Sequence, residues 1–281
     1  MMNRVLKRFG WIPDSKDERD YKFQAVPTIL EKLPEEASVE DLCPVVYNQG
    51  DSSSCVANAS ASAIISVHLK QGLPQPDPSR MFIYYGAREI EGTTHEDAGC
   101  MNRNAIKTLA KFGVCSETDW PFIPRNYSIR PSIECYSNAK KDIIISYHRI
   151  DSIPEPNFIL QNLKACIAEG YPFIFGIPIY ENFPIQTSSG IIPMPKGREI
   201  GGHALFGIAY NDYTNSVRFL NSWDGWGDGG YGELPYDYIS KYARDIWTIR
   251  SMEITPTVKE LSGTTFLDWI TILFNLIFKS K

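Results

Sequence analysis

Residues 45–72 read VVYNQGDSSSCVANASASAIISVHLKQG, an extended run followed by a polar turn and then a stretch rich in alanine and isoleucine. Small apolar residues recur at helical spacing after the turn, and Ser54 and Gly72 are suitable N-cap and stop residues, so a buried helix is predicted. Cys55 then lies in the first helical turn. The positive end of a helix dipole lowers a thiol pKa from its ordinary value of about 8.5. The segment therefore predicts a reactive cysteine at the start of a buried helix.

The rest of the chain divides into a helical half and a strand-rich half. Residues 78–90 and 103–113 have helical periodicity. The later strand-like runs, rich in β-branched and aromatic residues, are 142–150, 171–180, 203–212 and 216–223, with a helix predicted at 156–170. This order predicts an α+β fold in which a helical N-terminal lobe and a β-rich C-terminal lobe enclose a cleft.

Composition excludes several classes of protein. With 281 residues, 43% of them hydrophobic and 22% charged, the chain is an ordinary globular protein of one large domain or two lobes. A net charge of -5 without a dense Lys/Arg run argues against nucleic-acid binding. Six scattered cysteines without a CxxC pair, and four histidines, predict neither a disulfide scaffold nor a metal site, and no cofactor is expected. We leave the disulfide pairing and the redox compartment unassigned.

Two further segments supply partners for a cysteine nucleophile. His203 follows Gly201 and Gly202, which let the imidazole approach another surface closely. Asn221 comes 18 positions later (221 − 203), at the start of NSWDGWGDGGYG. An amide oxygen bonded to the second imidazole nitrogen fixes the tautomer of the ring, and Trp223 can shield that bond from water.

These three segments resemble the sequence blocks of the papain/cathepsin family of cysteine peptidases. The family blocks read Q-G-x-C-G-S-C-W, G-x-H-A and N-S-W-G-x-x-W-G-x-x-G-Y, where this chain has QGDSSSCV, GGHA and NSWDGWGDGGYG. The spacing of Cys55 and His203 (203 − 55 = 148) falls in the range of about 130–150 for such enzymes. The resemblance covers residues 42–252 and implies the papain-like two-lobe fold.

The resemblance implies a role for each matching residue. Cys55 is expected to be the nucleophile, His203 the acid and base, and Asn221 the residue that orients the imidazole. Gln49 is expected to donate to the oxyanion together with the Cys55 amide, and Gly99 to bind the substrate backbone through its main chain. The implied activity is hydrolysis of protein or peptide substrates through an acyl-enzyme.

The precise activity stays open. An endopeptidase is favoured because no long insertion closes one end of the cleft. The alternatives are an exopeptidase or transpeptidase, and a non-catalytic relative that binds peptides.

The nucleophile block departs from the family at three positions. Ser52 replaces the half-cystine, so the usual disulfide to the segment around Cys100 cannot form. Ser53 replaces the following glycine, and Val56 the tryptophan after the nucleophile. With the leader at residues 1–37, these changes indicate a divergent member of viral or bacterial type, and they affect cleft shape and how tightly the oxyanion loop is held.

The two ends of the chain lie outside the expected peptidase domain at 38–255. Residues 1–37 form a polar leader with three prolines and no signal-peptide pattern. The leader resembles the stretch before the peptidase domain in some relatives, and we expect a short pro-segment of a zymogen. The tail at 256–281 carries an apolar run at 266–278 with helical spacing of its polar residues. It is expected to dock on the body or a partner, to lie in a membrane interface, or to act as a short tail anchor. The cellular compartment is not predicted.

Overall fold

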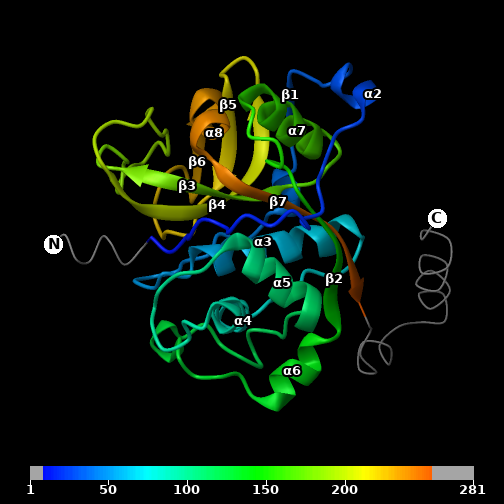
Figure 1. Ribbon diagram of the computed structural model, residues 1–281, viewed down its shortest axis with the longest axis vertical. Coiled ribbons are helices and arrows are strands. Elements are labelled where there is room, and N and C mark those ends of the chain that lie inside the picture. Colours follow the sequence, from blue (N-terminus) through cyan, green and yellow to red (C-terminus); the bar gives the residue numbers. More distant parts are fainter. Residues whose placement is uncertain (1–8, 255–281) are drawn as a thin grey trace.

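The computed structural model describes residues 9–254. Its lower half in Figure 1 is helical, and its upper half is built on an antiparallel sheet, with the start of the chain running between the two. The lower helices are α3 (Cys55–Lys70), α4 (Arg80–Glu91), α5 (Asn102–Phe112) and α6 (Ile133–Ala139). The predicted α+β fold with two lobes is confirmed.

The sheet has seven strands in the described part of the chain. Their order is β2-β7-β3-β4-β5-β6, with β1 pairing to the far end of β4, and the strand pairs are antiparallel. The strands are β1 (Glu36–Ser38), β2 (Asp142–Arg149), β3 (Phe173–Tyr180), β4 (Glu199–Asn211), β5 (Ser216–Leu220), β6 (Tyr231–Pro235) and β7 (Arg244–Ile254). The remaining helices are α2 (Pro27–Leu30), α7 (Pro156–Ala168) and α8 (Tyr236–Tyr242), with 3-10 turns at Glu40–Leu42 and Pro124–Asn126.

The four predicted helices and four predicted strands are present within a few residues of their expected bounds. Strands β1, β6 and β7 and the short helices α2, α6 and α8 were not predicted. The omission of β7 matters most, because β7 pairs with both β2 and β3 and so joins the edge of the sheet to its centre.

Helix α3 is the buried centre of the helical lobe. Its side chains from position 55 to position 68 are all buried, which small alanine and serine residues permit on every face. The helix ends next to Gly72, whose φ of +75° suits the left-handed conformation after a helix. The N-cap prediction is partly wrong, because Ser54 occupies that position but its hydroxyl does not cap the helix. The hydroxyl instead bonds Ser52 Oγ at 2.7 Å and accepts from Asn58 Nδ2 at 3.1 Å.

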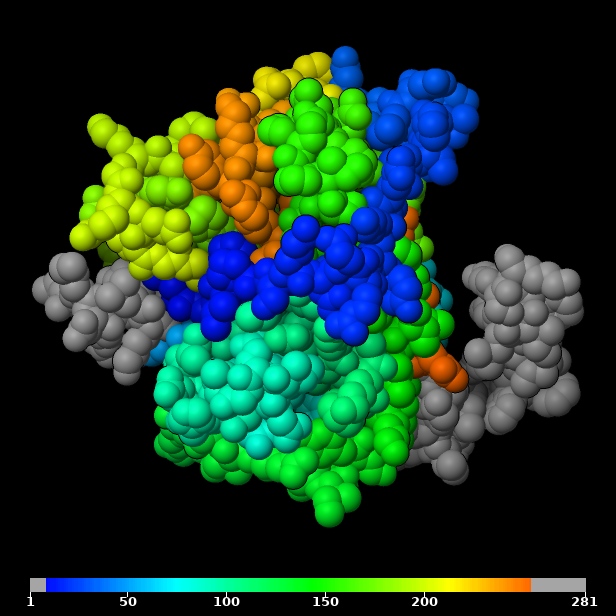
Figure 2. All heavy atoms as spheres, in the orientation of Figure 1, coloured from blue at the N-terminus to red at the C-terminus, as the bar shows by residue number. Residues whose placement is uncertain are grey.

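The leader lies along the boundary between the lobes. Figure 2 shows its first described residues, in dark blue, filling the furrow between the sheet above and the helices below. Three backbone bonds hold this part, from Trp11 N to Gly202 O (3.0 Å), from Cys100 N to Gly10 O (2.8 Å) and from Ile12 N to Cys100 O (3.1 Å). The leader therefore contacts β4 on one side and the segment before α5 on the other.

Within residues 9–254, no helix has the length and apolar character needed to cross a bilayer. The apolar run at 266–278 lies outside the described residues.

Candidate active site

Cys55 and His203 come from opposite lobes and meet at the boundary. Cys55 is the first residue of α3, and its sulfur accepts a hydrogen bond from the backbone N–H of Ala204 at 3.4 Å. Ala204 follows His203 on β4. Both side chains are fully buried, and Cys55 is a free thiol. The fold thus brings the expected nucleophile next to Ala204, the residue that directly follows the expected base on β4.

The His203 ring is fixed by residues of the turn that follows β5. Its Nε2 lies 2.8 Å from Asn221 Oδ1, which also accepts from the backbone N–H of Ser222 at 2.8 Å. Because that amide oxygen only accepts, Nε2 carries the proton and Nδ1 keeps a lone pair. Nδ1 is buried without a hydrogen-bond partner. Trp223 stacks on the imidazole with ring centroids 4.6 Å apart, so it covers the bond to Asn221 as expected.

Gln49 connects the turn before Cys55 to the residue after Asn221. Its backbone N–H donates to Ser222 O at 2.9 Å, and its Oε1 accepts from Ser222 Oγ at 2.6 Å. Its Nε2 donates to Ser52 O at 2.7 Å. Gln49 is fully buried, so the position of its amide is set by packing and hydrogen bonds. The sequence analysis did not identify Ser222 as part of this network.

Hydroxyl and carboxylate bonds occupy the place of the missing family disulfide. Ser52 Oγ bonds Gln49 O and Ser54 Oγ, each at 2.7 Å. The backbone N–H of Ser53 donates to the carboxylate of Asp97 at 3.1 and 3.2 Å. Asp97 lies three residues before Cys100, so this carboxylate joins the two segments that the disulfide would have linked.

Tyr84 extends this connection into α4. Its hydroxyl donates to Asp97 Oδ1 at 2.6 Å and accepts from the backbone N–H of Gly99 at 3.0 Å. Sequence analysis missed both Tyr84 and Asp97, because a tyrosine and a carboxylate 13 positions apart form no local pattern. Together they hold the chain around Gly99 against the turn before Cys55.

Gly99 lies where the leader comes closest to the helical lobe. Its φ is +80°, and a Cβ on it would meet Gly10 O at 2.1 Å. The main-chain bonds, however, are made by Cys100, which donates to Gly10 O at 2.8 Å and accepts from Ile12 N at 3.1 Å. Gly99 therefore allows a close backbone approach, and its neighbour provides the pairing.

The leader covers the cysteine directly. The backbone N–H of Gly10 is near enough to the Cys55 sulfur to oppose the rise in its pKa. A Cβ at Gly10 would lie 1.8 Å from Ser53 O, so only glycine fits there. Phe9 packs its ring against His203 and Trp223, with centroids 6.4 and 6.1 Å apart. The candidate site is thus closed to solvent by residues 9 and 10.

The covered site holds both reacting groups in their neutral forms. Burial raises the pKa of Cys55 to about 11, although N–H groups of Ala204 and Gly10 and of the first helical turn oppose this shift. Burial lowers the pKa of His203 to about 4, and the bond to Asn221 opposes that shift. At neutral pH the thiol and the imidazole are therefore uncharged while the leader is in place.

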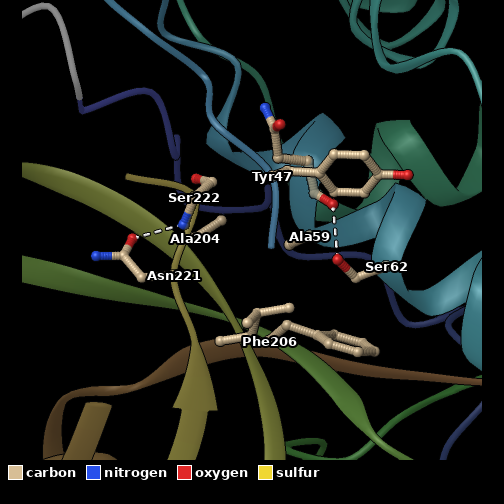
Figure 3. A pocket seen from close by; sticks show the side chains of 9 residues that line it. Tyr47, Ala59, Ser62, Ala204, Phe206, Asn221 and Ser222 are labelled. Atoms are coloured by element: carbon tan, nitrogen blue, oxygen red, sulfur yellow. Dashed lines mark hydrogen bonds between the residues drawn. The ribbon is translucent and has the colours of Figure 1, made fainter. Parts of the chain in front are cut away.

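A small pocket lies behind Asn221, between α3 and the sheet (Figure 3). Its volume of about 10 Å³ suits about one water molecule and no larger ligand. Within the described part of the chain, no group of three or more His, Cys, Asp or Glu side chains is arranged to hold a metal ion.

Comparisons with known proteins give the class of the molecule. No protein-family model matches the chain. An uncharacterised peptidase C1-like protein of Acanthamoeba polyphaga mimivirus is 33% identical over 276 residues, covering 88% of this chain and 88% of the relative. Xylellain, a cysteine protease from Xylella fastidiosa, has a TM-score of 0.80 at 36% identity, covering 88% of this chain and 97% of that one. Procathepsin B from Trypanosoma congolense shares the fold, with a TM-score of 0.72 at 15% identity, over 91% of this chain and 89% of that one.

The fold is therefore that of the papain-like peptidases. The chain belongs to the papain-like, C1-type family of cysteine peptidases, and it is a divergent member with viral and bacterial relatives.

Proposed function

We propose that this peptidase is a cysteine endopeptidase in which Cys55 attacks, His203 transfers protons and Asn221 orients the imidazole. The observation that supports this best is the chain of contacts across the lobe boundary. The sulfur accepts from the residue after His203, and the far nitrogen of that ring bonds Asn221 at 2.8 Å. Endopeptidase action is favoured because no long insertion is evident that would close one end of the cleft.

The reaction proceeds by acyl transfer. Once the leader leaves, the Cys55 proton passes to Nδ1 of His203, and the thiolate at the helix N-terminus attacks the scissile carbonyl. The Cys55 N–H and the Gln49 side chain stabilise the oxyanion, an effect worth roughly 3 kcal/mol per donor. His203 then protonates the leaving amine and activates water to release the acyl group. Substrate main chain pairs with the Gly99–Cys100 segment, where the leader now pairs.

We propose further that residues 1–37 are a pro-segment and that the full chain is a latent zymogen. The Gly10 N–H lowers the pKa of the Cys55 thiol, and the Gly10 carbonyl accepts from Cys100 N at 2.8 Å instead of facing the nucleophile. Nucleophilic attack needs a carbonyl carbon at the sulfur and an oxygen in the oxyanion site, and this arrangement offers an N–H instead. The leader thus occupies the site without presenting the Gly10 carbonyl to the nucleophile.

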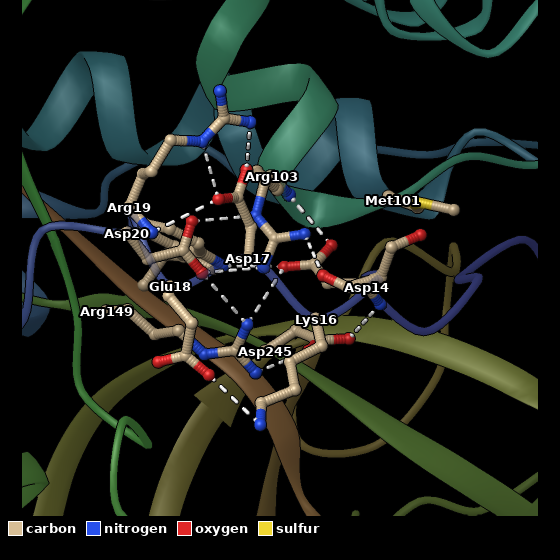
Figure 4. Close-up of polar contacts among 12 residues, drawn as sticks. Asp14, Lys16, Asp17, Glu18, Arg19, Asp20, Met101, Arg103, Arg149 and Asp245 are labelled. Atoms are coloured by element: carbon tan, nitrogen blue, oxygen red, sulfur yellow. Dashed lines mark hydrogen bonds and ion pairs between the residues drawn. The ribbon is translucent and has the colours of Figure 1, made fainter.

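An ion-pair cluster anchors the leader beyond the site, and Figure 4 shows its members. The backbone N–H of Asp14 donates to Asp245 Oδ2 at 2.7 Å. The Asp14 carboxylate accepts from the Arg103 backbone N–H at 3.0 Å and from Trp247 Nε1 at 2.9 Å. One leader residue therefore bonds α5 and β7 together.

Asp20 adds a second anchor six residues later. It forms a paired contact with the Arg103 guanidinium, at 2.8 Å to Nε and 2.6 Å to Nη2. Arg149 on β2 reaches the same carboxylate at 3.3 Å and Asp245 at 2.8 Å. Because these groups are mostly buried, their ion pairs hold the leader more firmly than surface pairs do.

The decisive experiment is labelling by a peptide carrying a thiol-directed electrophile. After removal of the leader, the wild-type enzyme is expected to be labelled and to cleave a peptide library at internal bonds, and Cys55→Ala is expected to do neither. Equal labelling of Cys55→Ala, or folded leader-free enzyme that cleaves nothing, would reject the assignment. Products that are only single residues or dipeptides from one end would identify an exopeptidase.

Latency is tested separately on the full-length chain. Its labelling rate is expected to be at least about 10-fold lower than that of the leader-free form, because the sulfur is covered. Equal rates would show that the leader does not control access to the nucleophile.

A further inference from the structure

Three cationic side chains of the peptidase body lie under the leader, beyond the candidate active site. Arg103 and Lys107 are four residues apart on α5, so they lie on the same face of that helix. Arg149 approaches the same place from β2, and its Nη1 lies 3.3 Å from Asp20, the carboxylate that Arg103 also binds. We call these three side chains the basic track. They remain in the protein when the leader is removed.

The leader places its carboxylates opposite the basic track. They recur at every third residue, and they are Asp14, Asp17 and Asp20. The paired nitrogens of the body lie 3.8, 3.7 and 2.6 Å from them, on Arg149, Lys107 and Arg103 in that order. The leader is therefore a built-in acidic ligand of the basic track.

Arg103 depends most on the leader for its partner. Its side chain is 5% exposed, and in the described part of the chain its ion pair is with Asp20. Removal of the leader leaves this guanidinium without a carboxylate, which is unfavourable for a charge in a largely buried position. Arg149 differs, because it also pairs with Asp151 and Asp245 of the body at 2.9 and 2.8 Å. The track is thus short of one negative charge when the leader is absent.

A second carboxylate position lies at the first turn of α5. The backbone N–H of Arg103 and Nε1 of Trp247 donate to the two oxygens of Asp14, at 3.0 and 2.9 Å. The Asp14 side chain is completely buried between them. Two donors aimed at the two oxygens of one carboxylate favour an acidic side chain over a neutral one. Both donors lose this acceptor when the leader leaves.

We propose that the leader-free enzyme uses the basic track to bind an acidic segment of its protein substrate. The inference rests on the proposed peptidase function and names its substrate class. The leader carbonyl that pairs with Cys100 belongs to Gly10, which is four residues before Asp14 and ten before Asp20 (14 − 10 and 20 − 10). A substrate that follows the same path therefore places its carboxylates about four to ten residues from this pairing point.

Binding is measured on the full-length Cys55→Ala chain, in which catalysis plays no part. The leader carboxylates are removed by Asp14→Asn, Asp17→Asn and Asp20→Asn. A fluorescent peptide of Asp-Gly-Ser repeats is expected to bind this chain at least about 10-fold more tightly than the chain with the native leader, because the track then lacks its carboxylates. Adding Arg103→Gln should abolish binding. Arg130→Gln removes the same charge at a 68% exposed position and should leave binding unchanged.

Two control ligands separate the basic track from general charge attraction. A peptide of the same composition with its aspartates contiguous should bind more weakly, because it does not match the spacing of the leader carboxylates. Inorganic phosphate at the same ionic strength should displace the repeat peptide poorly. Equal binding of the two peptides, displacement by phosphate at the peptide's own concentration, or binding that survives Arg103→Gln would overturn the proposal.

Kinetics on the leader-free wild-type enzyme test whether the acidic ligand is a substrate. The Asp-Gly-Ser repeats are joined in turn to each end of a cleavable peptide. At one end they are expected to lower KM at least about 5-fold relative to Asn-Gly-Ser repeats, with kcat unchanged, because the track lies away from the reacting atoms. Arg103→Gln should remove this difference.

The kinetic outcomes distinguish the site from the activity. Equal KM values for acidic and neutral repeats at both ends would overturn the acidic-substrate proposal and leave the peptidase assignment intact. Failure to cleave any of these peptides would reject the peptidase function on which the inference rests.

Discussion

The two nitrogens of the His203 ring have different environments, and this difference determines which proton can move. Nε2 donates to Asn221 Oδ1, and Nδ1 has no partner and is the base in the proposed mechanism. The amide of Asn221 is itself oriented by the backbone N–H of Ser222. A single buried amide thus selects the tautomer that can accept the thiol proton.

Replacing Asn221 by alanine is expected to lower kcat/KM of the leader-free enzyme. A lost buried hydrogen bond costs roughly 1–3 kcal/mol, which corresponds to about 5- to 150-fold in rate. Steady-state kinetics on a peptide substrate measures the change, and Asn157→Ala, at an exposed position of α7, is the control. An unchanged kcat/KM in Asn221→Ala would remove this residue from the mechanism.

Tyr84→Phe tests the contacts that stand in for the family disulfide. The variant removes only the hydroxyl, which serves both Asp97 and Gly99. We expect the free energy of unfolding to fall by roughly 1–3 kcal/mol, because the half-buried Asp97 carboxylate and the buried Gly99 amide lose a partner. Urea denaturation measures this fall. Tyr213→Phe is the matched control, since Tyr213 is 70% exposed, and a loss of the same size there would argue against a specific role for Tyr84.

At the level of elements, the leader is held by close backbone packing around Gly10 and by charged side-chain contacts around Asp14 and Asp20. Around Gly10 the backbone passes close to Ser53 and Gly99. Around Asp14 and Asp20 the contacts are a hydrogen bond from the Arg103 backbone and ion pairs with the side chains of Arg103 and Arg149. The two modes of attachment can be tested separately.

Gly10→Ala is expected to loosen the leader without changing the peptidase body. A Cβ there would overlap the Ser53 carbonyl, so the leader must move away from the sulfur. The labelling rate of Cys55 in the full-length chain should rise several-fold. Lys16→Ala changes an exposed leader side chain and serves as the control. If both variants label at the wild-type rate, the close fit at Gly10 does not limit access.

The ion-pair cluster also predicts how leader binding depends on pH. Burial, and next the charge of Asp14, raises the pKa of Asp245 to about 7, and burial raises the pKa of Asp14. The Asp14 and Asp245 carboxylates therefore bind a proton more tightly when the leader is docked than after it is released. Leader binding is strongest below the ordinary carboxyl pKa of about 4, and it weakens as pH rises toward and through 7. The facing charges are Arg103 and Arg149, with Asp20 and Asp151 as further carboxylates.

The measurement is trypsin cleavage of the leader in the inactive Cys55→Ala chain. The rate of trypsin cleavage after Lys16 and Arg19 should increase between pH 5 and 8. At each pH this rate is divided by the rate for the same chain carrying Asp14→Asn. Asp14→Asn removes the like-charge pair and should flatten the dependence. If trypsin cleaves the leader faster as pH falls, leader binding weakens in acid and the predicted pH dependence is wrong.

At the scale of the whole molecule, the leader spans both lobes and joins them. Phe9 and Trp11 contact the β lobe at His203 and Gly202, while Gly10 pairs with Cys100 of the helical lobe. The leader thus adds buried contacts that the peptidase domain alone does not have.

Cutting the leader away after folding is expected to lower Tm while raising activity. Arg103 and Arg149 would lose buried carboxylate partners, and the cleft would open to water. Calorimetry of the chain before and after cleavage measures the change. An unchanged Tm would mean that the leader contributes no stability to the folded enzyme.

The sequence by itself determined the helical and β halves, the helix that begins at Cys55, and the three blocks that identify a papain-like peptidase. These features depend on local periodicity and on motifs that are contiguous in the chain. Strand β7 was not predicted because Arg244–Ile254 has charged residues among its apolar ones. Its strand structure is evident only from its pairing with β2 and β3.

Only the tertiary structure decided what covers the Cys55 sulfur and what replaces the missing disulfide. Gly10 against Ser53, and Asp97 beside Ser53, are contacts between distant segments. Such contacts depend on how the lobes close around each other, and no local pattern of residue types encodes that closure.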